Sequence, residues 1–303
     1  MQEHRTLTLL LLAAATFVSP GCQRRGKVME VRDVEGRVPS ADGVEIAYSA
    51  RGKGDVALVL IHGGLADRGF WAPQMNAFAD RYRVVALDLG GHGESGRGRE
   101  EWTISSFAED VRAVVDALSL GRVVLIGNSL GGPVGLEAAP LLGGRTLGVV
   151  GIDTFHDVTE TFDAEQARAR AEAFRRNFVE TCDAMVASLF HPDCDPELLA
   201  WAKERMGATA PEVVVGLMEG LAGYDQARAV RGAGVPVRAV NGDLWPTEVE
   251  KNRAVAPGFD VKIIAKAGHY PMLEQPAEFN RRLLEVVGDL EKEAKRSGDR
   301  AQG

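Results

Sequence analysis

The sequence predicts an α/β fold: a mostly parallel eight-stranded sheet with helices on both faces and an inserted helical cap. Two observations support this prediction. Short apolar runs alternate with helix-forming segments along most of the chain, which is typical of a parallel sheet. From residue 154 to residue 231 such runs are missing, and alanine, glutamate and arginine dominate, which favours helices.

The expected strands follow one another in a regular order. Residues 37–48 read as a hairpin of two strands that turns at Ala41-Asp42-Gly43. The other six strands are expected at residues 56–61, 83–87, 122–126, 147–152, 235–240 and 259–265. Helices are expected from about Trp71, from the capping residue Thr103 to Leu118, and near residues 277–290.

These elements divide the chain of 303 residues into five parts. We expect a signal peptide at 1–22, a tether at 23–36, a core at 37–153 and 232–291, a cap at 154–231 and a polar tail at 292–303. A chain of this length that is 45% hydrophobic can bury a substantial core. The net charge of -8 argues against a nucleic-acid partner.

The N-terminal segment has the pattern of an export signal. Arg5 precedes an apolar stretch, 7–18, that is too short to span a bilayer. The stretch leads into Val18-Ser-Pro-Gly-Cys22, which resembles a bacterial lipobox with a lipid on Cys22, although Ser19 and Pro20 depart from that pattern. We therefore expect a protein that is exported to the periplasm or cell envelope and attached to the membrane through Cys22. Ordinary signal cleavage and a cytosolic tail are the alternatives.

Gly127-Asn-Ser-Leu-Gly131 is the most informative motif of the chain. It lies between the apolar run 122–126 and the helix-compatible run 133–139, which is the strand–turn–helix context that a G-x-S-x-G motif needs. Such a turn strains the backbone of the serine, so residues without bulky side chains are needed beside it. We interpret Ser129 as a nucleophile.

A base is expected late in the chain, and His269 fits this position. It follows the apolar run 259–265 and precedes the helical segment near Pro276. An imidazole that titrates near neutrality can take the proton of the serine and return it to a leaving group. A surface-loop histidine is the alternative interpretation.

An oxyanion hole needs two backbone N–H groups. One is expected from Leu130, directly after the nucleophile, and the other from the glycine-rich loop His62-Gly63-Gly64-Leu65 that follows the run 56–61. We assign the second donor to Gly64, with the neighbouring Leu65 as the alternative.

These motifs together resemble the α/β-hydrolase fold superfamily in its single-domain form with a helical cap. Four landmarks occur in the expected order and span about residues 40–290: His62-Gly63-Gly64 with Trp71 downstream, Asp88-Leu-Gly-Gly-His-Gly-Glu-Ser95, Gly127-Asn-Ser-Leu-Gly131, and Gly268-His269 followed by Pro276. The second landmark resembles the D-x-x-G-x-G-x-S loop that follows the fourth strand in this superfamily.

The acid of the expected triad departs from the pattern of the family. Members usually carry it three residues beyond a glycine that ends the seventh strand, but here that count leads from Gly242 to Trp245. Asp243 serves only if the turn is shorter than usual. Asp153, at the end of the sixth strand, is the other candidate, because catalytic residues of α/β sheets gather at the carboxyl ends of strands. We favour Asp153 and keep Asp243 as the alternative.

The cap is expected to decide the substrate. Leu65, Phe155 and Trp245 are candidate substrate-binding residues. Further candidates in the cap, for an apolar pocket or for plain core, are Phe174, Phe178, Met185, Phe190, Trp201, Met206 and Met218. Cys182 and Cys194, also in this region, are hypothesised to form a disulfide in an oxidising compartment, with two free thiols as the alternative.

The resemblance implies a reaction class. Epoxide hydrolases and haloalkane dehalogenases of the superfamily use an aspartate nucleophile, so Ser129 argues against both. Acyl transfer remains, with a small carboxylic ester or lactone as substrate and no cofactor. Hydrolysis of a carbon–carbon bond by the same residues is the alternative, and a ligand-binding protein with little turnover is a third. No Cys/His spacing suggests a metal site.

Overall fold

The computed structural model describes residues 34–161 and 163–301, with side chains through residue 297. The expected signal peptide, Cys22 and most of the expected tether lie outside the described residues. In the part that is described, no helix combines the length and the apolar character needed to cross a membrane.

The eight strands form one sheet in the order β1-β2-β4-β3-β5-β6-β7-β8. β1 and β2 are antiparallel to their neighbours, whereas the strands from β4 to β8 run parallel. Their bounds are Val34–Pro39, Glu45–Arg51, Ala57–Ile61, Arg83–Leu87, Val123–Asn128, Thr146–Ile152, Val237–Gly242 and Asp260–Ile264. The predicted fold class is confirmed.

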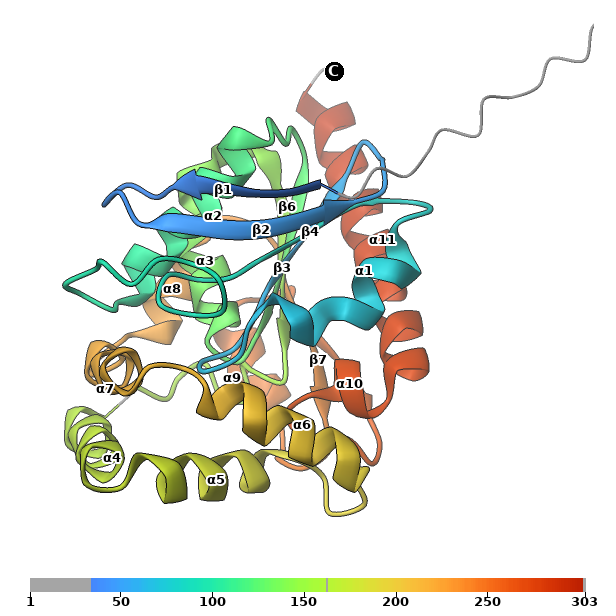
Figure 1. Ribbon diagram of the computed structural model, residues 1–303. Helices are drawn as coiled ribbons and strands as arrows, with labels where there is room; N and C mark the ends of the chain where they lie inside the picture. The colour runs from blue at the N-terminus through green and yellow to red at the C-terminus, as the bar shows by residue number, and fades with distance from the viewer. Residues whose placement is uncertain (1–33, 162, 302–303) are drawn as a thin grey trace, which may run out of the picture. The chain divides into compact units, whose positions relative to one another are not determined.

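Helices cover both faces of the sheet. Figure 1 shows α1 and α11 on one side, and α2, α3 and α8 on the other. These helices are α1 (Ala72–Phe78), α2 (Ile104–Ala117), α3 (Gly131–Leu142), α8 (Gln226–Gly232) and α11 (Pro276–Ala301). The shorter elements are η1 (Arg68–Trp71), η2 (Gly143–Arg145), α9 (Val249–Val255) and α10 (Pro271–Glu274).

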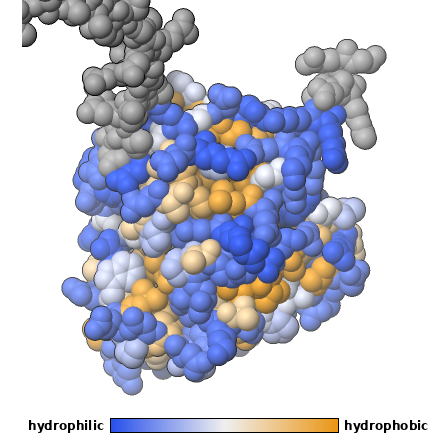
Figure 2. Space-filling view, turned by 90° about the vertical axis from the view of Figure 1, so that its right-hand side faces the viewer, coloured by the Kyte–Doolittle hydropathy of each residue, from blue (hydrophilic) through white to orange (hydrophobic). Residues whose placement is uncertain are grey.

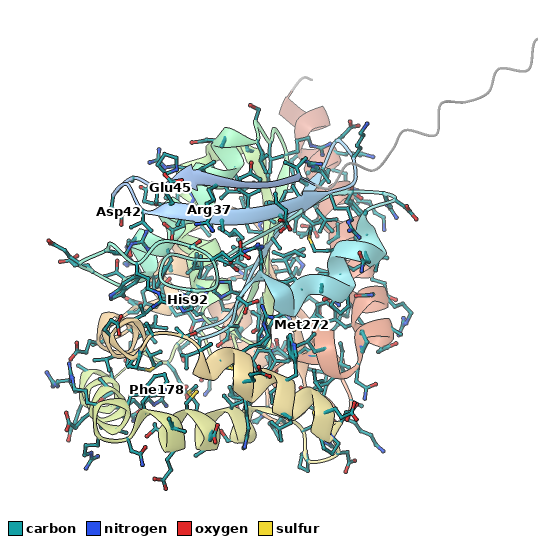
Figure 3. All side chains as sticks on the ribbon, viewed as in Figure 1. Arg37, Asp42, Glu45, His92, Phe178 and Met272 are labelled. Carbon is teal, nitrogen blue, oxygen red and sulfur yellow. The ribbon has the colours of Figure 1, made fainter. Side chains whose placement is uncertain are left out.

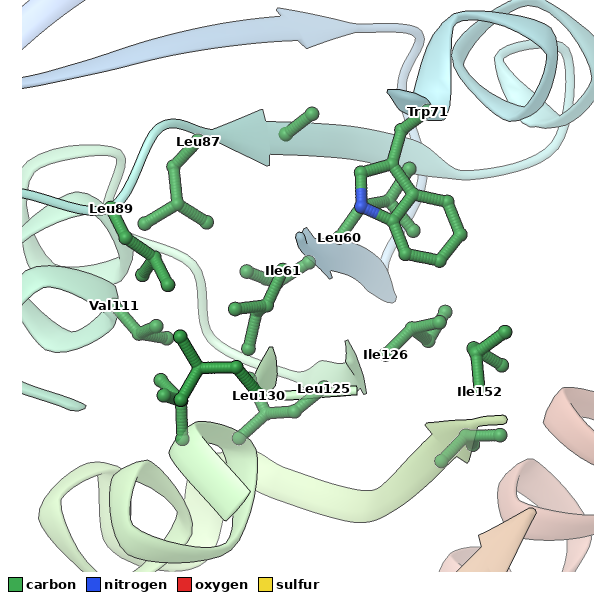
Figure 4. Close-up of a cluster of buried hydrophobic side chains, with 14 of the residues drawn as sticks. Leu60, Ile61, Trp71, Leu87, Leu89, Val111, Leu125, Ile126, Leu130 and Ile152 are labelled. Atoms are coloured by element: carbon green, nitrogen blue, oxygen red, sulfur yellow. The ribbon is translucent and has the colours of Figure 1, made fainter. Parts of the chain in front are cut away.

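The central strands are buried on both faces. Every residue of β3 and β5 is buried, because helices cover both sides of the sheet there. Figure 4 shows part of this core, where Trp71 lies near Leu60 and Ile126. Outside the core, hydrophobic residues form several patches that hydrophilic residues interrupt on the face drawn in Figure 2.

Four helices between β6 and β7 form the cap: α4 (Ala164–Arg176), α5 (Phe178–Leu189), α6 (Pro196–Gly207) and α7 (Pro211–Gly220). They lie together at the bottom of Figure 1, where Figure 3 labels Phe178 at the start of α5. The expected cap of residues 154–231 includes most of α8, but α8 packs on α3 and pairs Arg228 with Glu137. The expected polar tail likewise continues α11 to Ala301, since its Glu, Lys, Ala and Arg residues favour a helix.

Two fully buried histidines follow the neighbouring strands β3 and β4. The Nδ1 atom of His62 lies 2.7 Å from the Gly63 carbonyl oxygen, and its Nε2 accepts a hydrogen bond from the Leu89 amide at 2.9 Å. The ring of His92, labelled in Figure 3, lies with its centre 5.1 Å from that of His62. Burial lowers the pKa of His62 to about 4 and that of His92 to about 3, so both rings are neutral at pH 7.

We expect these histidines to make folding sensitive to acid. Below about pH 6.5 the two imidazoles are protonated in the unfolded chain but stay neutral in the folded protein. The free energy of unfolding therefore decreases as the pH falls from about 6.5 towards about 4. Each histidine adds about 1.4 kcal/mol per pH unit to the slope of the unfolding free energy against pH. His92→Leu should therefore reduce this slope by that amount. Urea unfolding of the wild type and of His92→Leu at pH 6 and pH 5 measures the two slopes. Equal slopes would contradict the buried neutral state of His92.

Candidate active site

Ser129 lies in a tight turn between β5 and α3. Its φ angle is 50°, in the left-handed region that is strained for a residue with a side chain. Two close backbone approaches define the turn. A Cβ atom on Gly127 would lie 2.0 Å from the Gly131 carbonyl oxygen, and one on Gly131 would lie 2.4 Å from the Ile61 carbonyl oxygen. Any larger residue at either position would clash with the backbone, so both glycines are required. The motif has the strand–turn–helix context that the sequence predicted.

His269 and Asp153 face each other at the carboxyl ends of β8 and β6. The Nδ1 atom of His269 lies 2.7 Å from Oδ2 of Asp153. The second carboxylate oxygen of Asp153, Oδ1, accepts a hydrogen bond from the Gly242 amide at 2.9 Å. Asp153 is 1% exposed and has a φ of 44°, so a rigid and buried turn holds its carboxylate against the imidazole.

A second histidine lies beside the same carboxylate. Nε2 of His156 is 3.6 Å from Oδ2 of Asp153. Burial alone would raise the pKa of Asp153, but the interactions with His156 and His269 outweigh it and lower this pKa to about 2. Asp153 is therefore an anion at neutral pH. The sequence analysis missed His156 at this site, although its position three residues after Asp153 was a usable signal.

Asp243 does not occupy the equivalent place. Its side chain is exposed, and its Oδ1 accepts a hydrogen bond from the Ala267 amide at 3.3 Å. The adjacent Gly242 amide binds the carboxylate of Asp153 instead. The turn after β7 thus directs Asp243 to backbone groups, and the alternative acid assignment is not supported by the geometry.

Backbone N–H groups face the same space as Ser129. Gly64 and Leu130 both line the cavity that contains Ser129, and in the described part of the chain neither amide has a hydrogen-bond acceptor. Leu65, the alternative donor, has a φ of 62°, and its carbonyl accepts a hydrogen bond from Thr209 Oγ1 at 2.9 Å. The Leu65 amide likewise has no acceptor among the described residues, so Leu130 and either Gly64 or Leu65 can supply the two donors that an oxyanion requires.

The cavity has a volume of about 660 Å³ and extends from Ser129 and His269 into the cap. Its lining includes Leu65 and Phe155, as expected, and a set of apolar residues from the cap helices and the segment after α7. These are Phe174, Met185, Leu189, Met206, Leu217, Met218 and Leu221. Polar residues at the cavity include Asp157, Glu160, Asp163 and Arg170.

Several expected pocket residues lie elsewhere. Trp245 is not part of the lining of this cavity, and its ring meets His269 edge-on with centres 5.8 Å apart. Phe178, Phe190 and Trp201 are also outside the lining and pack on other side chains of the cap and core. Trp245 therefore packs against His269 and does not line the substrate cavity.

The hypothesised disulfide is not formed. Cys182 is buried and Cys194 is half-buried, and both are free thiols. Burial raises the pKa of both thiols, that of Cys194 to about 11, so neither is a reactive thiolate at neutral pH. The Sγ of Cys194 lies 3.4 Å from the Asp195 carbonyl oxygen, whereas Cys182 is buried on α5.

The cap is joined to the loop that carries Gly64. Arg205 of α6 donates two hydrogen bonds to Asp67, at 2.9 and 2.7 Å, in a bidentate pair. Burial would raise the pKa of Asp67, but Arg205 outweighs it and the net pKa is lowered. Together with the bond from Thr209 to Leu65, this pair fixes one wall of the cavity.

Residues 58–282 match the profile of the alpha/beta hydrolase family. The chain belongs to this family. The resemblance inferred from the four motifs is confirmed, and the match runs from β3 into α11.

Two solved structures of the family are similar over most of the chain. A thermophilic esterase from Thermogutta terrifontis, with malate bound, is 26% identical with a TM-score of 0.74, covering 85% of this chain and 99% of its own. Est816, described as an N-acyl homoserine lactone degrading enzyme, is 26% identical with a TM-score of 0.70, covering 82% of this chain and 99% of its own.

A curated relative points to different chemistry. The 2-hydroxy-6-oxo-6-(2'-aminophenyl)hexa-2,4-dienoic acid hydrolase of Metapseudomonas resinovorans is 27% identical over 277 residues, which is 83% of this chain and 90% of its own. The names of these three proteins give different substrates: an ester, an N-acyl homoserine lactone and a dienoic acid.

We expect the two aspartates to be separable by reactivity. Asp153→Asn removes the anion that accepts the Nδ1 proton of His269, so labelling of Ser129 by a fluorophosphonate should slow by about 1,000- to 10,000-fold. Asp243→Asn, the matched control, should stay within about threefold of the wild type because its carboxylate is exposed and accepts a hydrogen bond from the Ala267 amide. Equal losses in the two variants would contradict the assignment.

Proposed function

We propose that this protein hydrolyses a carboxylic ester or lactone through an acyl-enzyme on Ser129. The observation that supports the proposal best is the hydrogen-bonded pair of buried Asp153 and half-buried His269 at the cavity that also contains Ser129 and the free N–H groups of Gly64 and Leu130. These groups have the roles that acyl transfer needs: nucleophile, base, orienting acid and oxyanion donors.

In the proposed acylation step, Ser129 Oγ attacks the carbonyl carbon while Nε2 of His269 takes its proton. The carbonyl oxygen becomes an oxyanion held by the amides of Leu130 and Gly64. When the intermediate collapses, the bond to the leaving oxygen breaks, and His269 returns the proton to that oxygen. Asp153 stays ionised and stabilises the imidazolium.

Water completes the cycle by the reverse sequence. His269 takes a proton from the water as its oxygen attacks the acyl carbon, and the proton then passes to Ser129 Oγ as the acid product leaves. The apolar cap residues around the cavity favour an alkyl or aryl acyl group, because their surface is removed from water when the substrate binds.

The second candidate is hydrolysis of a carbon–carbon bond in a diketone-like acid. It is favoured by the dienoic acid hydrolase among the relatives and by Arg170 in the cavity lining, a cation that suits a carboxylate. The same serine and histidine would carry this reaction, so the two candidates differ in substrate rather than in machinery.

We expect kcat/KM for p-nitrophenyl esters to increase from acetate to hexanoate. The reason is that each CH₂ of the acyl group buried in the cavity adds about 0.8 kcal/mol of transfer free energy. Ser129→Ala should reduce the turnover by at least about 1,000-fold. A γ-lactone and a 2-hydroxy-6-oxo-dienoate should be assayed beside the esters. Turnover of the dienoate alone would favour the second candidate, and no labelling by a fluorophosphonate would favour a ligand-binding protein.

We also propose that the chain is exported and lipidated on Cys22. The apolar stretch of residues 7–18 and the lipobox-like segment that follows it support this proposal. In a bacterial host, the full chain should fractionate with membranes, whereas Cys22→Ser should be found in the soluble fraction. Equal membrane association of the two proteins would contradict lipid attachment.

A further inference from the structure

We propose that Asn128 is a positioning residue that joins the three segments of the catalytic triad through one side-chain amide. The inference rests on the function proposed above. Asn128 is the last residue of β5, directly before Ser129, and it is fully buried. Its backbone therefore belongs to the nucleophile turn, while its side chain is free to reach the neighbouring segments.

The Nδ2 group of Asn128 donates two hydrogen bonds. One goes to the carbonyl oxygen of Ile152 at 3.0 Å, and the other to the carbonyl oxygen of His269 at 2.9 Å. Ile152 directly precedes Asp153, and His269 is the base itself. A single planar amide thus fixes the backbone of the acid and of the base relative to the nucleophile.

The two contacts have different weight. The Ile152 carbonyl also accepts the Ser129 amide at 3.0 Å, so it keeps a partner without Asn128. In the described residues, the His269 carbonyl has Asn128 as its one hydrogen-bond donor. Loss of Nδ2 would therefore release the backbone of the base, whose ring bonds to Asp153 and, in the proposed mechanism, takes the proton of Ser129.

The surroundings of Oδ1 of Asn128 show that the N–H groups of Nδ2, and not the oxygen, favour an amide at this position. Oδ1 of Asn128 is buried without a hydrogen-bond donor among the described residues, which destabilises the folded state. It packs against the loop of the oxyanion donors, where a Cβ atom on Gly63 would lie 2.9 Å from it. An apolar side chain of the same shape would avoid this cost, so the benefit of an amide here comes from its N–H groups.

The chain offers a matched control in Gln74. This glutamine is also fully buried, and its Nε2 donates to the Met272 carbonyl and to Asn280 Oδ1, at 3.0 and 2.9 Å. Its Oε1 is likewise buried without a donor in residues 34–161 and 163–297. Gln74 lies on α1 and bridges to α10 and α11, so it repeats the bonding pattern of Asn128 without contacting Ser129, Asp153 or His269.

The test compares Asn128→Leu with Gln74→Met, two near-isosteric changes that remove both donors and add no charge. We expect kcat for a p-nitrophenyl ester to fall by about 30- to 100-fold in Asn128→Leu, the loss expected for a displacement of about 1 Å, with KM nearly unchanged. Gln74→Met should keep kcat within about twofold, although both variants lose thermal stability to a similar extent.

A readout without substrate separates this proposal from the proposed function. The far-downfield proton resonance of His269 Nδ1–H, bonded to Asp153, should be present in the wild type and in Gln74→Met, and shifted or broadened in Asn128→Leu. If the wild type turns over no ester, the proposed function fails while this resonance still tests the positioning role. An unchanged resonance in Asn128→Leu would overturn the proposal.

Two further outcomes are decisive. Loss of kcat to the same extent in Gln74→Met would mean a general effect of removing a buried amide, which overturns a specific role of Asn128. If Asn128→Leu does not fold, Asn128→Ser is the second variant. Its shorter side chain cannot span both carbonyls, and the same losses in kcat and in the resonance are expected of it.

Discussion

The backbone crossing at Gly127 and Gly131 is the constraint on which the site depends. Strand β5 and helix α3 can meet at this distance only because neither glycine carries a Cβ atom. The approach of Gly131 to the Ile61 carbonyl also fixes the turn against the end of β3, where the loop with Gly64 begins. The strained φ of Ser129 is thus maintained by close packing on both sides, as expected when surrounding structure over-determines a residue.

Burial and pairing act in opposite directions on the titratable groups around this turn. Asp153 is ionised because two histidines outweigh its burial. His62 and His92 are neutral because burial outweighs the backbone carbonyls and nearby aspartates that would raise their pKa values. The neutral ring of His62 can therefore use one nitrogen as donor to the Gly63 carbonyl and the other as acceptor from the Leu89 amide. In this way a buried polar side chain connects the ends of β3 and β4 beneath the oxyanion loop.

The sequence predicted most of the fold and the tight turn at Ser129 because these depend on local signals. Apolar runs specify the strands, and the spacing of Gly127, Ser129 and Gly131 specifies the turn. The choice between Asp153 and Asp243 depended on how two turns direct their side chains, which a one-dimensional pattern does not contain. For the same reason the sequence did not indicate that Asn128 bonds to Ile152 and His269, since these contacts cross 24 and 141 residues.

Substrate choice is the part of the function that local signals describe least. On the cap side the cavity walls come from α4, α5, α6 and α7, and amphipathic helices of this kind place apolar residues in core and pocket alike. What decides the lining is the way the cap rests on the core. Arg205 forms a bidentate pair with Asp67, and Thr209 donates a hydrogen bond to the Leu65 carbonyl. These contacts fix the cavity wall that carries Met206 to the loop that carries Gly64. Chemistry and specificity therefore share one set of contacts, and a change in how the cap is seated would alter both.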